Sequence, residues 1–283
     1  GMQAFPSMSM VESFTHKKDR SLDSDVMNVH QKASLGTGNL MKYVEDYYRV
    51  NDDFDSVAGL SQIMQAEAIR FAVEAHRRNM PYCMGTLYWQ FNDCWPVISW
   101  SSIDYGGNWK ALHYAARKFF SPLLVSMRDL DNKIEIHVTN DQHYEIESEI
   151  RLGLFNFNGD TLFNDSSDIK VEPFSSVIYR AFDKDDLLGG SDPSAIMFRV
   201  ELFVDSKVIS RAQQYFRRPK HLSIPSPEFD YEIERVSGKY VITVRSKSFL
   251  CQLHLISTKV RGVFSDNYFD MLPGEVQMID FEP

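Results

Sequence analysis

The chain has 283 residues, 43% of them hydrophobic and 13% aromatic, which is enough for two or three structural units with real cores. Its net charge of −9 argues against a nucleic-acid partner, and no apolar run approaches the roughly 18 residues of a membrane span. Three cysteines, Cys83, Cys94 and Cys251, lack the spacing of a disulfide framework and leave the cellular compartment open.

The first segment, residues 1–13, reads Gly-Met-Gln-Ala-Phe-Pro-Ser-Met-Ser-Met-Val-Glu-Ser and looks like the continuation of a preceding element. A glycine before a methionine is also what a cleaved expression tag leaves, so localisation cannot be read from this end. Residues 19–38 are polar and rich in turn formers. Their histidine and aspartate spacing matches no recognised ligand set, so we expect a solvated loop and no metal site.

Two helices are expected next, over residues 39–48 and 56–78. The second has an apolar stripe at three- and four-residue intervals. Asp55 or Ser56 can cap its start, and Asn79 followed by Pro81 ends it. The residues of the expected packing face are Val57, Leu60, Met64, Ala68, Phe71, Ala72 and Ala75.

The stretch from residue 85 to 109 holds all four tryptophans of the chain. Residues 83–91 form an apolar run that predicts a buried strand, and the polar pair Asn92-Asp93 follows directly. Polar groups at the carboxyl end of a buried strand are how a (β/α) barrel presents a site. Flat aromatic rings beside amides and carboxylates suit a sugar ring. The alternative is that the tryptophans are core and the aspartate caps a turn.

A further helix is expected over residues 109–119, which gives the order helix, strand, helix. This order is typical of the closing segment of a barrel, because eight strands cannot be found in the first 120 residues. This part of the chain is the α/β portion of the expected fold class, which is α/β plus all-β.

Beyond Pro122 the pattern changes to short alternating strands separated by turn residues, which indicates a β-sandwich. A proline-rich hinge, residues 217–227, leads to a second and smaller alternating unit. This unit should pack against its neighbour, because it is near the lower size limit for independent stability. The expected strands are residues 133–140, 149–157, 168–171, 176–180, 195–204, 207–216, 229–234, 239–245, 251–257, 262–264 and 275–281.

Three parts of the chain resemble β-mannosidases, members of glycoside hydrolase family 2. They are Gln-Ala-Phe-Pro at residues 3–6, the central motif, and the closing Ser-Asp-Asn-Tyr-Phe-Asp-Met-Leu-Pro-Gly-Glu at residues 265–275. The central motif runs Tyr88-Trp89-Gln90-Phe91-Asn92-Asp93-Cys94-Trp95-Pro96, then Ser-Trp-Ser-Ser-Ile-Asp at 99–104 and Trp-Lys-Ala-Leu-His-Tyr at 109–114. The resemblance implies the C-terminal part of a (β/α)8 barrel over residues 1–120. Two Ig-like β-sandwich domains would follow, over 121–218 and 219–283.

The same resemblance implies a retaining mechanism with two glutamates about 5–5.5 Å apart, one nucleophile and one acid/base. The nucleophile would lie two positions ahead of Gly1, and the Asn-Glu of the acid/base has no counterpart, so no catalytic residue is expected in this chain. Trp89 would be the aromatic wall of the subsite for the non-reducing mannosyl unit. Asn92 and Asp93 would contact a sugar hydroxyl or fix the loops beneath the site.

These observations favour the C-terminal part of a hydrolase that removes non-reducing terminal β-D-mannose, with a β-mannoside oligosaccharide or glycan as partner and no cofactor. The isolated piece should be inactive, since both catalytic glutamates and the rest of the barrel lie outside it. β-Galactosidase or β-glucuronidase specificity within the same family is one alternative. A non-catalytic carbohydrate-binding protein made of β-sandwiches is the other.

Overall fold

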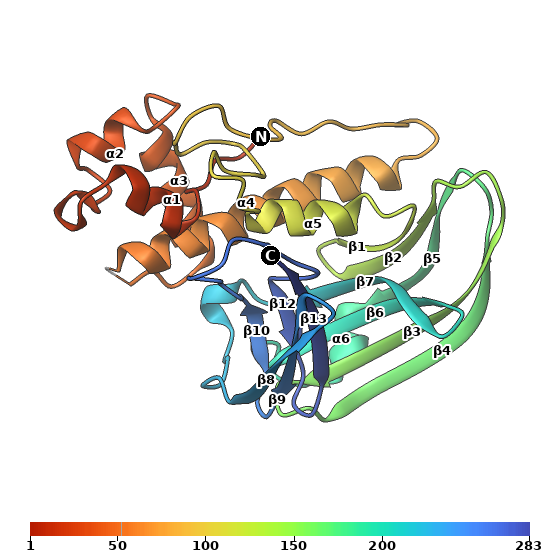
Figure 1. Ribbon diagram of the computed structural model, residues 1–283. Helices are drawn as coiled ribbons and strands as arrows, with labels where there is room; N and C mark the ends of the chain where they lie inside the picture. Colours follow the sequence, from red (N-terminus) through yellow and green to blue (C-terminus); the bar gives the residue numbers. More distant parts are fainter. Residues whose placement is uncertain (52) are drawn as a thin grey trace.

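The computed structural model describes residues 1–51 and 53–283, and it has a helical part next to two β-sheet units (Figure 1). The longest helix, α4, packs along α5, and both lie over the β strands. In the described residues no helix is both long and apolar enough to cross a membrane. The helices of this part are α1 (Met8–Phe14), α2 (Asp25–Val29), α3 (Gly36–Tyr47), α4 (Phe54–Arg78) and α5 (Ala111–Phe119), with a 3-10 turn η1 (Lys17–Asp19).

The three helices expected from the sequence are present, but α4 differs from the prediction in its cap and its face. Its N-cap is Asp53, whose carboxylate accepts hydrogen bonds from the Ser56 backbone N–H at 3.0 Å and from the Ser56 hydroxyl at 2.7 Å. Phe71, placed on the packing face by its spacing, is 68% exposed. The buried face includes polar residues instead, among them Ser61, Gln62 and Gln65. Apolar periodicity misses such a face because polar groups occupy part of it.

The buried strand predicted over residues 83–91 is wrong for the chain as described. These residues are extended but belong to no strand, and they include Leu87, which is 99% exposed. A buried strand needs a hydrogen-bonding neighbour on each side. Here the backbone makes isolated contacts only, such as the donation from Gln90 N–H to the Trp100 carbonyl at 3.0 Å. The segment traces a long loop above α4 and α5 (Figure 1).

The first β unit is a sandwich of two antiparallel sheets, with strand orders β1-β2-β5 and β4-β3-β6-β7. The predicted alternation in β2 is confirmed, since Ile134, Ile136 and Val138 are buried between the sheets. The strand β1 and the helix α6 were not predicted. The elements are β1 (Leu123–Asp129), β2 (Lys133–Asn140), β3 (Ile146–Asn156), β4 (Thr161–Val171), β5 (Ser175–Asp183), α6 (Lys184–Leu188), β6 (Ile196–Val204) and β7 (Lys207–Tyr215).

The second β unit has a four-stranded sheet, β11-β13-β9-β8, facing a two-stranded sheet, β10-β12. Its core includes Tyr114 from α5, with Trp109 packed against it. The expectation that this small unit packs against its neighbour is therefore confirmed, because Phe249 stacks on Phe157 of the first β unit, and helix α5 adds a second contact. After a 3-10 turn η2 (Pro219–His221), its strands are β8 (Phe229–Val236), β9 (Lys239–Ser246), β10 (Leu250–Leu253), β11 (Val263–Phe264), β12 (Phe269–Met271) and β13 (Val276–Glu282).

Charged and aromatic contacts join the three parts. The Arg77 guanidinium of α4 donates to the carbonyls of Phe119 and Ser121 at 2.6 and 2.8 Å and to the Asp141 carboxylate at 2.7 Å. Phe157 of the first β unit stacks on Phe249 of the second, with ring centroids 4.1 Å apart. The division into domains at residues 120 and 218 stays a prediction.

Candidate functional site

The N-terminal segment lies against the central motif, although about a hundred positions separate them in the sequence. Ala4 and Ser99 form an antiparallel bridge, in which the Ala4 N–H donates to the Ser99 carbonyl at 2.9 Å and the Ser99 N–H donates back at 3.3 Å. Two of the segments on which the family resemblance depends therefore meet in space.

The polar face of α4 holds the other edge of this N-terminal segment. The Phe5 N–H donates to the Ser61 hydroxyl at 3.0 Å, and Gln62 Nε2 donates to the Phe5 carbonyl at 3.2 Å. Gln65 Nε2 reaches the Met2 carbonyl at 2.8 Å. Buried backbone groups need partners. In this segment helix side chains supply them in place of a neighbouring strand, which explains why α4 buries amides and a hydroxyl.

Asp93 lies beneath the surface, only 5% exposed. Its carboxylate accepts hydrogen bonds from the Ser99 hydroxyl at 2.7 and 2.8 Å and from the Ser101 hydroxyl at 2.5 Å. Lys32 Nζ lies 3.4 Å from Asp93 Oδ1 and links the segment after α2 to the motif. Both oxygens are thus engaged within the chain, so the geometry favours the loop-fixing role over a direct contact with a ligand.

Asp104 is a second buried anchor that the sequence analysis did not select. Its Oδ2 accepts from the Ser7 N–H at 3.1 Å and from the Ser7 hydroxyl at 2.6 Å, and its Oδ1 accepts from the Asn108 N–H at 2.9 Å. The Asp-Tyr-Gly-Gly-Asn string at residues 104–108 is a turn signal. That signal could have suggested an aspartate that binds backbone N–H groups, but not its contact with Ser7.

Lys110 lies between these two anchors and is 1% exposed. Its Nζ is 3.3 Å from the Ala4 carbonyl and 3.5 Å from the Ser99 carbonyl. Burial lowers the pKa of Lys110 to about 7, while the Asp93 and Asp104 carboxylates act in the opposite direction. The burial of Lys110 was not predicted, because an isolated lysine at a helix start is normally solvated.

Trp89 is 65% exposed, although its backbone is held close to the N-terminal segment. A Cβ built on Gly1 would lie 2.4 Å from the Trp89 carbonyl oxygen. Only a glycine allows so close an approach. The backbone of Trp89 thus passes next to Gly1, and its indole ring reaches the surface from that position.

Asn92 is also exposed, and its side chain donates to the Asp93 carbonyl at a long 3.5 Å. Its backbone carbonyl accepts from Gln90 Nε2 at 2.8 Å. Of the three predicted site residues, Trp89 and Asn92 therefore reach the surface, and Asp93 is buried.

The other three tryptophans have packing contacts. Trp95 lies against His30, with ring centroids 5.3 Å apart, and Trp109 lies against Tyr114 at the same distance. The Trp109 ring also packs against the core of the second β unit.

The acidic groups of the site have structural partners. Asp93 and Asp104 are both buried and hydrogen-bonded to serine and asparagine. Within residues 1–51 and 53–283 there is no group of three or more His, Cys, Asp and Glu that could hold a metal ion. Asp93 and Asp104 are therefore both engaged within the chain.

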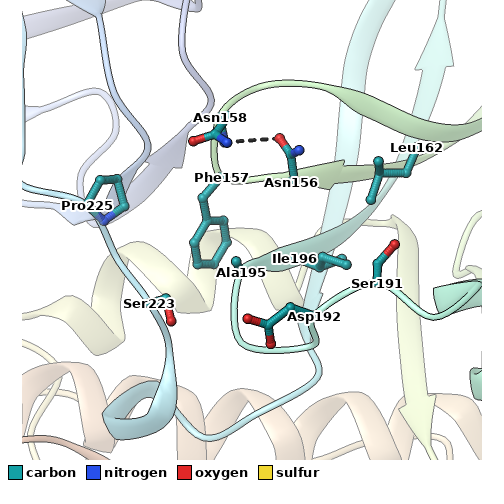
Figure 2. A pocket seen from close by; sticks show the side chains of 10 residues that line it. All are labelled: Asn156, Phe157, Asn158, Leu162, Ser191, Asp192, Ala195, Ile196, Ser223 and Pro225. Carbon is teal, nitrogen blue, oxygen red and sulfur yellow. Dashed lines mark hydrogen bonds between the residues drawn. The ribbon is translucent and has the colours of Figure 1, made fainter.

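A cavity of about 290 Å³ lies where the first β unit meets the linker to the second (Figure 2). Asn156 and Asp192 line it, but their side chains bind neighbouring backbone N–H groups of the chain. Phe157 is 4% exposed and one face of its ring is covered by Phe249. The cavity can admit a small polar molecule, but it offers no open aromatic face for a sugar.

Comparison with known proteins gives matches along the whole chain. Two family models match, one described as a Mannosidase Ig/CBM-like domain over residues 132–221 and one as an Ig-fold domain over residues 224–283. β-Mannosidase B of Aspergillus niger is 26% identical over 305 aligned residues, which cover 99% of this chain and 35% of that protein. β-Mannosidase of Capra hircus is 36% identical over 145 residues, or 46% of this chain and 16% of that protein.

Solved structures give the same picture. The β-D-mannosidase of Dictyoglomus thermophilum superposes with a TM-score of 0.91 and 27% identity, covering 100% of this chain and 34% of that one. An exo-chitosanase of Amycolatopsis orientalis superposes with a TM-score of 0.75 at 14% identity, covering 99% of this chain and 38% of that one, and shares the fold alone. The chain spans about a third of the length of the whole-chain matches.

Proposed function

Because the chain belongs to the β-mannosidases of glycoside hydrolase family 2 and corresponds to their C-terminal part, we propose that it forms one wall of the site that removes terminal β-D-mannose. In this proposal residues 1–120 are the end of a (β/α)8 barrel, and the two β units that follow are Ig-like sandwiches. The catalytic glutamates belong to barrel segments that precede Gly1.

One observation carries the proposal: the backbone of Trp89, whose ring is exposed, passes so close to Gly1 that a Cβ built there would lie 2.4 Å from the Trp89 carbonyl oxygen. Two residues of extended chain span roughly 7 Å. A nucleophile two positions ahead of Gly1 would therefore be within reach of a sugar stacked on the Trp89 ring. An aromatic face suits the apolar C–H face of a pyranose, and ring stacking in such a subsite helps to orient the anomeric carbon.

The neighbouring residues have distinct roles in this proposal. Trp89 is the platform for the sugar, and Asn92, exposed beside it, donates to or accepts from a sugar hydroxyl. Asp93 fixes both from below through Ser99 and Ser101. The run of exposed apolar residues at 82–91 becomes a barrel strand when the neighbouring strands are present.

Hydrolysis of p-nitrophenyl glycosides tests the proposal. The complete protein should hydrolyse the β-D-mannoside faster than the β-D-galactoside or the β-D-glucuronide, and the 283-residue chain alone should hydrolyse none of them. Turnover of the mannoside by the pure chain would overturn the assignment of the catalytic groups outside it. A preference for the galactoside or glucuronide would establish the alternative specificity of the same family.

Sugar binding by the β units is the second candidate, favoured by the match to a model described as Ig/CBM-like. The cavity in Figure 2 is the place in the first β unit where this candidate can be tested. It predicts that mannose oligosaccharides bind the 283-residue chain and that Asn158→Ala, at the rim of the cavity, weakens this binding. Trp89→Ala serves as the matched control. If only Trp89→Ala weakens binding, the sugar occupies the site proposed above.

A further inference from the structure

Lys110 contacts both segments that meet beneath Trp89. Its Nζ lies 3.3 Å from the Ala4 carbonyl and 3.5 Å from the Ser99 carbonyl. These two carbonyls also accept the two backbone hydrogen bonds of the Ala4–Ser99 bridge. The Lys110 amine therefore adds a donor to each half of the bridge and holds the two segments together.

The Lys110 amine is shielded from water, and two carboxylates act on it. Lys110 is 1% exposed, and the carboxylates that act on it are Asp93 and Asp104. Asp93 belongs to the motif through Ser99 and Ser101, and Asp104 belongs to the N-terminal segment through Ser7. A carboxylate whose charge acts on Lys110 is thus attached to each of the segments that it joins.

Stability alone does not account for such a residue. Taking an ammonium out of water costs several kcal/mol, and a well-packed apolar side chain of similar length is often equally or more stabilising at such a position. Methionine would fill much of the same space but could donate to neither carbonyl. What the lysine adds is a fixed relation between two backbones.

We propose that Lys110 is a positioning residue, which holds residues 2–7 in register with Ser99 and so sets where the chain ahead of Gly1 enters the site beside Trp89. The inference rests on the proposed function for its catalytic consequence. The contact of Lys110 with Ala4 and Ser99, called the clamp below, is a property of this chain and can be measured separately.

Amide hydrogen exchange on the 283-residue chain tests the clamp without any assay of catalysis. In Lys110→Met we expect exchange in residues 2–7 to become at least tenfold faster, while β2 and β3 keep their protection. Lys118→Met is the matched control, since Lys118 lies two turns along the same helix and is half exposed in an ion pair with Asp266. Unchanged exchange in residues 2–7 overturns the inference. A loss of protection throughout the chain also overturns it, because Lys110 would then be a general determinant of folding.

Kinetics of the complete protein test the catalytic consequence. Per folded molecule, Lys110→Met should lower kcat for p-nitrophenyl β-mannoside at least tenfold and leave KM within twofold, since the sugar platform at Trp89 is untouched and the nucleophile is displaced. An equal loss in Lys118→Met, or a rise in KM with unchanged kcat, overturns the positioning role. A complete wild-type protein that hydrolyses no glycoside overturns the proposed function, and the exchange experiment then still decides whether Lys110 is the clamp.

Discussion

Replacing Asp93 with alanine should destabilise the helical part of the chain by about 2–5 kcal/mol. The carboxylate accepts from two serine hydroxyls, and Ser99 and Ser101 are both fully buried. Hydrogen bonds to a charged group contribute about 1.5–3 kcal/mol each. Part of the loss is recovered, because without the carboxylate the single hydroxyl hydrogen of Ser99 can be donated to Ser101 Oγ, 3.0 Å away. Lys32 is partly exposed and can return to water.

Tryptophan fluorescence during urea unfolding is the assay, because all four tryptophans lie between residues 89 and 109. Far-UV circular dichroism follows the secondary structure of the whole chain in the same samples, so a transition at the tryptophans that separates from the overall one is visible. Ser101→Ala should cost less than Asp93→Ala, and the double variant should cost less than the sum, since the two residues share one hydrogen bond.

Asp230→Ala is the matched control for this experiment. Asp230 lies on β8 in an ion pair with Lys247 whose side chains are both more than half exposed. Exposed pairs of this kind contribute about 0–1 kcal/mol, so its midpoint should stay close to that of the wild type. A fluorescence midpoint for Asp93→Ala that coincides with the wild type, or that moves no more than in the control, would refute the role of Asp93 as a buried anchor.

Three further predictions concern other parts of the chain. Trp89→Ala should leave the unfolding midpoint of the chain unchanged, because the ring is 65% exposed, and should lower kcat/KM of the complete protein for the mannoside by about 10–100-fold. Between pH 7 and 10 the free energy of unfolding of the wild-type chain should rise by about 1.4 kcal/mol per pH unit relative to that of Lys110→Met. The reason is that a lysine with a folded pKa of about 7 releases on folding a proton that the unfolded chain binds up to pH 10. Below pH 7 the difference in free energy of unfolding between the two chains should become constant, and a difference that is flat across both ranges would contradict the prediction. Tyr215→Phe should destabilise the β units by about 1–3 kcal/mol in thermal melts followed by circular dichroism. The Tyr215 hydroxyl of the first β unit donates to the buried Asp270 carboxylate of the second. A melting temperature equal to that of the wild type would show that this hydrogen bond contributes nothing.

The β units were the part of the fold that the sequence predicted best. In β2 the alternation of apolar residues sets which side chains face the core, and the expected residues 133–140 are the strand bounds found in the structure. The strand β12 was missed because it has only three residues, Phe269–Met271, too few to show an alternation. The size of the second β unit predicted that it packs against a neighbour, since so small a sandwich cannot bury a sufficient core by itself. The part played by α5 was not predicted.

Residues 83–91 show where local pattern fails. Their composition predicts a buried strand, but strand formation depends on neighbours that no local pattern supplies. Lys110 and Asp104 were missed for a related reason. Their roles come from contacts with Ala4 and Ser7, about a hundred residues away, and a sequence of one protein carries no record of such a contact.

The polar face of α4 connects these failures to the function. Apolar periodicity placed Phe71 on the packing face of that helix, and the structure instead buries Ser61, Gln62 and Gln65. Each of the three binds a backbone group of Met2 or Phe5. A helix that packed on this segment with apolar residues would leave those backbone groups unpaired, at about 1–3 kcal/mol each. The polar residues on the buried face of α4 are therefore there to bind the backbone of the N-terminal segment. That segment is the one that lies beside Trp89 at Gly1.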